Sequence, residues 1–366
     1  MQAGSAVRAG PANSLADVRG LRVGHVTLAG DGWLTGVTVV LTPPEGATGG
    51  VDVRGGGPGT RETDLLSPLN QVDRVNAIVL SGGSSYGLSA AHGVLTRLAA
   101  LHRGVQVGPE PSHVVPIVPA AILFDLGRGG VFGNYPGPDA GAAAFDAALS
   151  PPPNGPAPPG NVGAGTGALA GQLKGGIGAA SEVLTDSETT GAGITVAALA
   201  AVNAVGSVAD HRTGLLHGAQ FGLPGEFDWL LPPSPAELRA SAALLDPRPR
   251  SDQRAAPRPL NTTIGVVATD ASLTKAQCAK LAGVAHDGLA RAVRPAHSMF
   301  DGDTIFGLAT GSGPVASPLE FHAILSAAAD CFSRAVVHAA LSASAVTTPA
   351  GTWPGYLDLF PSADGR

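Results

Sequence analysis

A hydroxyl residue at the start of a predicted buried strand is the first candidate for chemistry. The Arg- and Pro-rich segment DPRPRSDQRAAPRPL, residues 246–260, ends at Asn261-Thr262-Thr263, where the apolar run IGVVATDA begins. A flexible loop that leads straight into a strand suits backbone self-cleavage, in which the Thr262 hydroxyl attacks the Asn261 carbonyl and Thr262 becomes a new N-terminus. Its α-amine, with a pKa of about 7.7 to 8.0, would then be a general base. Taken alone, the motif also fits an ordinary loop-to-strand boundary.

Two closely spaced carboxylates form the second candidate. Asp301 and Asp303 stand one residue apart at the entrance to the predicted strand TIFGLATG, residues 304–311. In an extended chain they would point to one face, where they could orient an amine or, together with His297, bind a metal ion. An Asx turn leading into the strand is the simpler interpretation. Because no second cluster with ligand spacing accompanies them, we predict no metal site.

Lysine usage singles out one further residue. Only three of the 22 basic residues are lysines, and Lys174 lies in the Gly- and Ala-rich stretch 163–181, where backbones can pack closely. A lone ammonium there would alter the pKa of neighbouring groups, although an exposed loop lysine is the alternative. Lys275 and Lys280 fall on the polar face of a predicted helix, where we expect solvated charges.

A competing nucleophile lies in the segment GGSSYG, residues 82–87. Gly83, Ser85 and Gly87 match GxSxG between a predicted strand and a predicted helix, which is the context of a nucleophile elbow. Ser85 would then need a downstream acid and a histidine, such as His297, His322 or His338. The same residues also fit a Gly/Ser turn that caps a helix, and no acid-to-histidine segment stands out.

The elements that must position these residues indicate an α/β protein with sheets covered by helices. The predicted strands are β-branched or nearly continuous apolar runs, which indicates cover on both faces; they span residues 35–44, 75–80, 115–127, 193–210, 264–271 and 304–311. Helices are predicted from Ser84 to about Leu101, from Thr274 to Pro295, and onward from Ser317. Three Pro-rich segments, 150–161, 231–238 and 246–260, should be exposed loops.

Composition and charge exclude several classes of protein. The 366 residues are 44% hydrophobic and 14% charged, so the chain can bury a core and lacks the signature of disorder. A net charge of −6 offers no basic surface to nucleic acid. The first eighteen residues hold no apolar run of signal-peptide length, so we expect a cytoplasmic protein that contacts no membrane. Cys278 and Cys331 form no motif and should be reduced and buried.

Six ordered segments resemble the DmpA-type aminopeptidases, a family that includes L-aminopeptidase/D-amidase/esterases, β-peptidyl aminopeptidases and nylon-oligomer hydrolases. The resemblance runs from about residue 14 to about 345, and we treat residues 1–366 as a single catalytic domain. The segments are GGGPGTRETDLL (55–66), VNAIVLSGGSSYGLSAA (75–91), GAGTGALAGQLKGGIGAAS (163–181), AAVNAVGSV (200–208), NTTIGVVATDA (261–271) and ARAVRPAHSMFDGDTIFGLATG (290–311).

The resemblance implies a four-layer αββα sandwich and a precursor that cuts itself before an N-terminal nucleophile. On this resemblance the nucleophile would be Thr262, and cleavage after Asn261 would give an α chain of residues 1–261 and a β chain of residues 262–366. In family members the serine of the segment matching Ser85 is not the nucleophile. The residues that match other family positions are Asn203, Lys174, Asp301 and Asp303 as catalytic groups and Tyr135 as a substrate-binding group.

The implied reaction is amide hydrolysis through an acyl-threonine, without metal or organic cofactor. Asn203 would donate its side-chain amide to the oxyanion, while Lys174 and the aspartate pair would position the nucleophile, bias its amine towards the neutral form or keep a proton path open. The resemblance implies small substrates, which are short peptides, amino-acid amides or esters, β-peptides or nylon oligomers, and a homo-oligomer of processed αβ units. The alternatives are a serine esterase using Ser85 and an uncleaved, non-catalytic member.

Overall fold

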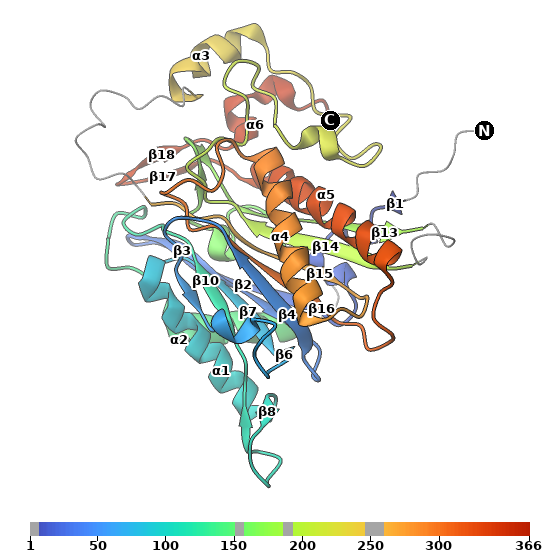
Figure 1. Cartoon of the computed structure of the whole chain (residues 1–366). Helices are drawn as coiled ribbons and strands as arrows, with labels where there is room; N and C mark the ends of the chain where they lie inside the picture. Colours follow the sequence, from blue (N-terminus) through green and yellow to red (C-terminus); the bar gives the residue numbers. More distant parts are fainter. Residues whose placement is uncertain (1–6, 151–156, 186–192, 246–259) are drawn as a thin grey trace.

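Two sheets packed face to face form the centre of the molecule, and pairs of helices cover their outer faces (Figure 1). The computed structural model describes residues 7–150, 157–185, 193–245 and 260–366. α1 (Ala90–Ala100) and α2 (Pro138–Leu149) cover one sheet, and α4 (Lys275–Ala292) and α5 (Pro318–Ser342) cover the other. This arrangement confirms the predicted four-layer αββα sandwich.

The larger sheet contains the strand that follows the Asn261-Thr262 junction, together with the two strands that pair with it. Its only parallel pair among the described strands is β15 (Ile264–Thr269) with β16 (Thr304–Ala309), and the other neighbours are antiparallel. In spatial order its seven strands are β1 (Val7–Arg8), β13 (Ile177–Leu184), β14 (Thr195–Ala201), β15 (Ile264–Thr269), β16 (Thr304–Ala309), β4 (Ala47–Val53) and β6 (Arg74–Val75).

The smaller sheet is antiparallel except where β7 (Ala77–Ser81) and β10 (Ala120–Ile122) run in the same direction. Its order is β2 (Arg22–Gly30), β3 (Trp33–Leu41), β7 (Ala77–Ser81), β10 (Ala120–Ile122) and β5 (Thr60–Arg61). Three two-stranded ribbons complete the described strands: β8 (Val105–Gln106) with β9 (Val114–Val115), β11 (Leu169–Ala170) with β12 (Leu173–Lys174), and β17 (Val346–Thr348) with β18 (Gly351–Trp353).

Alternate residues of the central strands enter two different cores. Val266 of β15 and Leu80 of β7 meet in the core between the sheets, whereas Val267 packs into the core beneath α4 and α5. A third core lies between the smaller sheet and its helices. Because successive strand side chains point to opposite faces, strands covered on both faces are apolar throughout. This explains the continuous apolar runs in the sequence.

The long helices begin where the sequence predicts. Thr274 and Ser317 each close a capping box, with Gln277 and Glu320 respectively. α5 is long and apolar enough to cross a membrane by composition, but 72% of its most apolar window is buried inside the protein, which is typical of a core helix. The helix predicted from Ser84 begins as a 3-10 helix, Ser84–Ser89, before α1.

Several local predictions are wrong or fall outside the described residues. Lys275 is buried rather than solvated, because its ammonium donates to the carbonyl oxygens of Leu65, Asn70 and Val72 at 2.8 to 3.1 Å. The predicted loop 231–238 turns into α3 (Pro235–Leu245), and the predicted strand 115–127 shortens to β10. Residues 246–259 of the third Pro-rich loop and 151–156 of the first lie outside the described residues. α6 (Tyr356–Leu359) follows β18.

Close contact between helix and sheet is expected to make Gly178 of β13 intolerant of any side chain. A Cβ there would lie 2.1 Å from the carbonyl oxygen of Ala335 in α5. Gly178→Ala should therefore lower the free energy of unfolding by about 1–3 kcal/mol, measured by urea denaturation. The matched control is Gly133→Ala, where a Cβ meets nothing within 4 Å; equal effects of the two substitutions would contradict this packing.

Candidate active site

The peptide bond between Asn261 and Thr262 is buried at the point where β15 begins. The Thr262 N–H donates to the backbone oxygen of Asn203 at 2.6 Å, just beyond the end of β14. On the other side, the Asn261 N–H donates to the Phe300 carbonyl at 2.9 Å, and the Asn261 carbonyl accepts the Gly302 N–H at 3.0 Å. Because these bonds continue the sheet pairing, the flanking segments hold the peptide bond from both sides.

The Thr262 hydroxyl lies against the carbonyl group that self-cleavage would attack. Its Oγ donates to the Asn261 carbonyl oxygen at 2.5 Å. Gly302 packs on the same hydroxyl, and a Cβ at that position would lie 2.7 Å from the Thr262 Oγ. Only glycine therefore allows the backbone to bring its N–H to the Asn261 carbonyl here. The Gly302 N–H is a hydrogen-bond donor suited to negative charge on that oxygen.

The two aspartates are both buried but bind different partners. Asp303 accepts the Thr263 N–H on one oxygen at 2.8 Å, and His297 Nδ1 lies 2.8 Å from its other oxygen. Asp301 accepts the Val205 N–H at 3.1 Å and the Ser298 N–H at 3.0 Å. The bonds from Ser298 run backwards along the chain, so they do not form the predicted Asx turn into the strand. Burial raises the pKa of Asp301 above its ordinary value.

The surroundings of His297 are relevant to the alternative in which this histidine and the two aspartates bind a metal ion. The His297 ring packs edge-on against His286 at a centroid separation of 4.8 Å. Burial lowers the pKa of His286 to about 4, so this ring is neutral near pH 7. Within residues 7–150, 157–185, 193–245 and 260–366, no group of three or more His, Cys, Asp and Glu side chains is placed to hold a metal ion.

Asn203 is fully buried, and its side chain is held on both ends. Its Oδ1 accepts from Arg128 Nη1 at 2.6 Å and from the Leu169 N–H at 3.0 Å. Its Nδ2 donates to the Phe124 carbonyl at 3.2 Å. The Asn261 carbonyl thus accepts from the Gly302 N–H and the Thr262 hydroxyl, while Asn203 holds the nitrogen side of the bond through its own backbone oxygen.

Lys174 lies in a cage of backbone oxygens rather than on an exposed loop. Its ammonium donates to the carbonyls of Gly165, Ala168 and Gly175 at 2.7 to 3.0 Å. Burial lowers the pKa of Lys174, whereas three acceptors require all three of its N–H groups. Lys174 makes no described hydrogen bond to Thr262. It holds the Gly-rich loop whose Leu169 N–H binds Asn203.

Sequence reasoning missed two charged residues behind the junction, Asp125 and Arg128. Arg128 donates to Asn203 and also, through Nη2, to the Asn261 side chain at 3.0 Å. Asp125 accepts the Gly83 N–H at 2.7 Å, and burial raises its pKa to about 6. Asp125 directly follows the apolar run at 115–124, and Arg128 lies three residues further on. An Asp and an Arg three residues apart at the end of a buried strand were the available signal.

The remaining predicted residues lie elsewhere in the described fold. Ser85 is exposed in the 3-10 helix and makes no described hydrogen bond to a histidine. The positive φ of 53° falls on Ser84 instead, so the nucleophile-elbow geometry is not centred on Ser85. Tyr135 is 37% exposed and stacks on Tyr86 with centroids 4.8 Å apart. Cys278 and Cys331 are free and buried, as predicted.

Solved aminopeptidases share this fold. A β-aminopeptidase from a Burkholderia species superposes with a TM-score of 0.70 and 23% identity, covering 98% of this chain and 96% of that one. The L-aminopeptidase D-Ala-esterase/amidase of Ochrobactrum anthropi, described as a variant of the Ntn hydrolase fold, gives 0.70 at 21% identity and covers 95% of this chain and 92% of that one. The described architecture is therefore that of the Ntn-hydrolase-fold aminopeptidases.

Within that class, the chain belongs to peptidase family S58, whose model matches residues 13–353. An uncharacterized aminopeptidase of Mycobacterium tuberculosis is 47% identical over 96% of this chain and 99% of its own. A 6-aminohexanoate-oligomer endohydrolase from a Kocuria species is 31% identical over 75% of this chain and 69% of its own. The protein is a hydrolase that acts on peptide or amide bonds.

The raised pKa of Asp125 predicts a particular pH dependence of stability. Its folded-state pKa is about 6 against an ordinary 3.8, so the folded protein keeps this proton where the unfolded chain has lost it. From about pH 4 to pH 6 the group's contribution to stability therefore falls with rising pH, by on the order of 3 kcal/mol. Asp125→Asn should remove that fall.

Urea unfolding of both proteins between about pH 4 and pH 7 measures this effect. The stability of Asp125→Asn relative to wild type should rise with pH up to about pH 6 and level off above it. Asp146→Asn removes a half-exposed carboxylate that pairs with Arg97 at 2.7 Å, and it controls for the loss of one negative charge. A pH-independent difference for Asp125→Asn would contradict the buried, proton-retaining carboxyl.

Proposed function

We propose that the chain is a self-processing aminopeptidase or amidase whose nucleophile is Thr262, freed by cleavage after Asn261. The observation that carries the proposal is the buried Asn261-Thr262 bond, whose carbonyl oxygen lies 2.5 Å from the Thr262 hydroxyl and 3.0 Å from the Gly302 N–H. A nucleophile and an oxyanion donor thus meet at one carbonyl group. We further propose a cytoplasmic enzyme that works as a homo-oligomer of processed units.

Self-cleavage exchanges an amide for an ester and then hydrolyses it. The Thr262 Oγ bonds to the Asn261 carbonyl carbon, the bond from that carbon to the Thr262 nitrogen breaks, and the hydroxyl proton passes to the nitrogen. Water then cleaves the ester, which leaves the Asn261 carboxylate and restores the hydroxyl. The Gly302 N–H stabilises the oxyanion in both steps. The products are residues 1–261 and residues 262–366.

In the mature enzyme the acyl part of the substrate takes the place that Asn261 leaves. The Phe300 carbonyl, which accepts the Asn261 N–H at 2.9 Å, is then available to a substrate amine. The Gly302 N–H and the Asn203 side-chain amide are the candidate oxyanion donors. The freed α-amine of Thr262 takes the proton of its own hydroxyl, and an acyl-threonine forms and is hydrolysed. Short peptides, amino-acid amides or esters and amide oligomers are the proposed substrates.

The nucleophile is tested by two substitutions of unequal severity. Thr262→Ala should remain a single chain and lose amidase activity, because no hydroxyl is left to attack. Thr262→Ser keeps a hydroxyl and should still divide into two chains. A denaturing gel and hydrolysis of amino-acid p-nitroanilides measure both properties. Two chains from Thr262→Ala would contradict the proposal, and activity lost in Ser85→Ala alone would favour the serine esterase.

The role of Asn203 is tested separately in processed enzyme. Asn203→Ala should lower kcat on the order of 100-fold to 1000-fold if its amide stabilises the oxyanion of the substrate reaction. Co-expression of the two chains, residues 1–261 and 262–366, bypasses any effect on self-cleavage. An unchanged kcat would remove Asn203 from that role without touching the assignment of Thr262.

A further inference from the structure

We infer that Arg128 is a positioning residue for self-cleavage, holding the two residues that fix the scissile bond. The inference rests on the proposed function and adds a residue that neither the motifs nor the resemblance single out. Arg128 Nη2 donates to the Asn261 side chain at 3.0 Å, and Nη1 donates to the Asn203 side chain at 2.6 Å. Asn203 in turn holds the Thr262 N–H at 2.6 Å through its backbone oxygen.

One guanidinium therefore acts on both sides of the bond. On the acyl side the guanidinium binds the side-chain carboxamide of Asn261. On the amine side it binds Asn203, whose backbone oxygen holds the Thr262 N–H. A planar guanidinium presents its donors in a rigid fork, which fixes the separation and the angle between two acceptors. An ammonium cannot reproduce that geometry, so lysine is not an adequate replacement at this position.

The surroundings of Arg128 keep this fork in place. The side chain is buried, and its Nη1 also donates to the Gly167 carbonyl at 2.7 Å. Its backbone oxygen accepts the Thr348 hydroxyl at 2.6 Å. Burial lowers the pKa of Arg128 to about 10, which leaves it charged near pH 7. Arg128 therefore acts through its geometry and transfers no proton.

Arg128→Lys and Arg128→Met should slow cleavage of the bond on the order of 100-fold, because small misplacements of reacting atoms cost about that much. Cell-free synthesis gives the uncut chain, and intact mass at successive times gives the half-time. Asn261→Ala, which retains the arginine but removes its acyl-side acceptor, should also slow cleavage. This variant keeps the test valid even where an Arg128 variant fails to fold.

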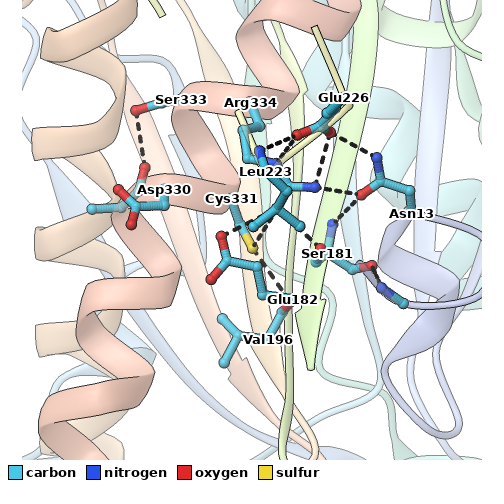
Figure 2. Close-up of polar contacts among 12 residues, drawn as sticks. Asn13, Ser181, Glu182, Val196, Leu223, Glu226, Asp330, Cys331, Ser333 and Arg334 are labelled. Carbon is cyan, nitrogen blue, oxygen red and sulfur yellow. Dashed lines mark hydrogen bonds and ion pairs between the residues drawn. The ribbon is translucent and has the colours of Figure 1, made fainter. Parts of the chain in front are cut away.

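Arg334 supplies a matched control, because it is a second buried arginine held by side chains away from the junction. Figure 2 shows its guanidinium between Glu226 and Asn13. The Nε lies 2.6 Å from a Glu226 oxygen, and Nη2 lies 2.8 Å from Asn13 Oδ1. Because both arginines are buried, Arg334→Lys and the Arg128 substitutions should all lower Tm, yet Arg334→Lys should leave the half-time of cleavage unchanged. Equal slowing in both would reduce Arg128 to a stabilising role and overturn the inference.

A double-mutant cycle gives a readout that general destabilisation would not produce. If Arg128 acts through Asn261, Arg128→Met should slow cleavage less in the Asn261→Ala background than in wild type. If Arg128→Met slows cleavage by the same factor in both backgrounds, the inference is overturned. A wild-type rate of cleavage in Arg128→Lys or in Asn261→Ala would also overturn it. A wild-type chain that never cuts itself would refute the proposed function instead, so the two failures are distinguishable.

Discussion

The continuation of sheet hydrogen bonding past the strand ends is the constraint on which the site depends. β15 runs antiparallel to β14 and parallel to β16, so the end of β14 and the beginnings of β15 and β16 meet at one edge. Asn203 follows β14, Asn261 and Thr262 precede β15, and the Asp301 segment precedes β16. The Asn261-Thr262 bond is therefore held as part of the sheet, with its carbonyl and its nitrogen bound on opposite sides.

Behind that edge, buried charges hold the loops that carry the hydrogen-bond donors. Lys174 fixes the Gly-rich loop by three carbonyl oxygens, and Arg128 links this loop to Asn203 and Asn261. Burying such charges costs several kcal/mol per ion unless each is well paired. The acceptors that offset this cost belong to the junction or to its supporting loop, so the same contacts that stabilise the folded chain also fix the position of the Asn261-Thr262 bond.

Much of this arrangement is predictable from the sequence because burial leaves a clear pattern. Continuous apolar strands and capped helices predict covered sheets, and the change from an Arg- and Pro-rich segment to an apolar run locates the Asn261-Thr262 junction. Local sequence does not predict what an isolated charge binds. Lys275 has the sequence pattern of a surface residue, yet it binds three loop carbonyls from residues 65–72. The role of Arg128 depends on its contact with Asn261, which is 133 residues away in the sequence. Such pairings depend on tertiary packing, which periodicity does not encode.

The central claim is that the buried Asn261-Thr262 bond is cut by its own threonine. The most direct test is the intact mass and N-terminal sequence of the purified wild-type protein under denaturing conditions. The account predicts two chains, the smaller beginning Thr262-Thr263-Ile264. A single chain near 36.2 kDa that stays whole on prolonged incubation would contradict it.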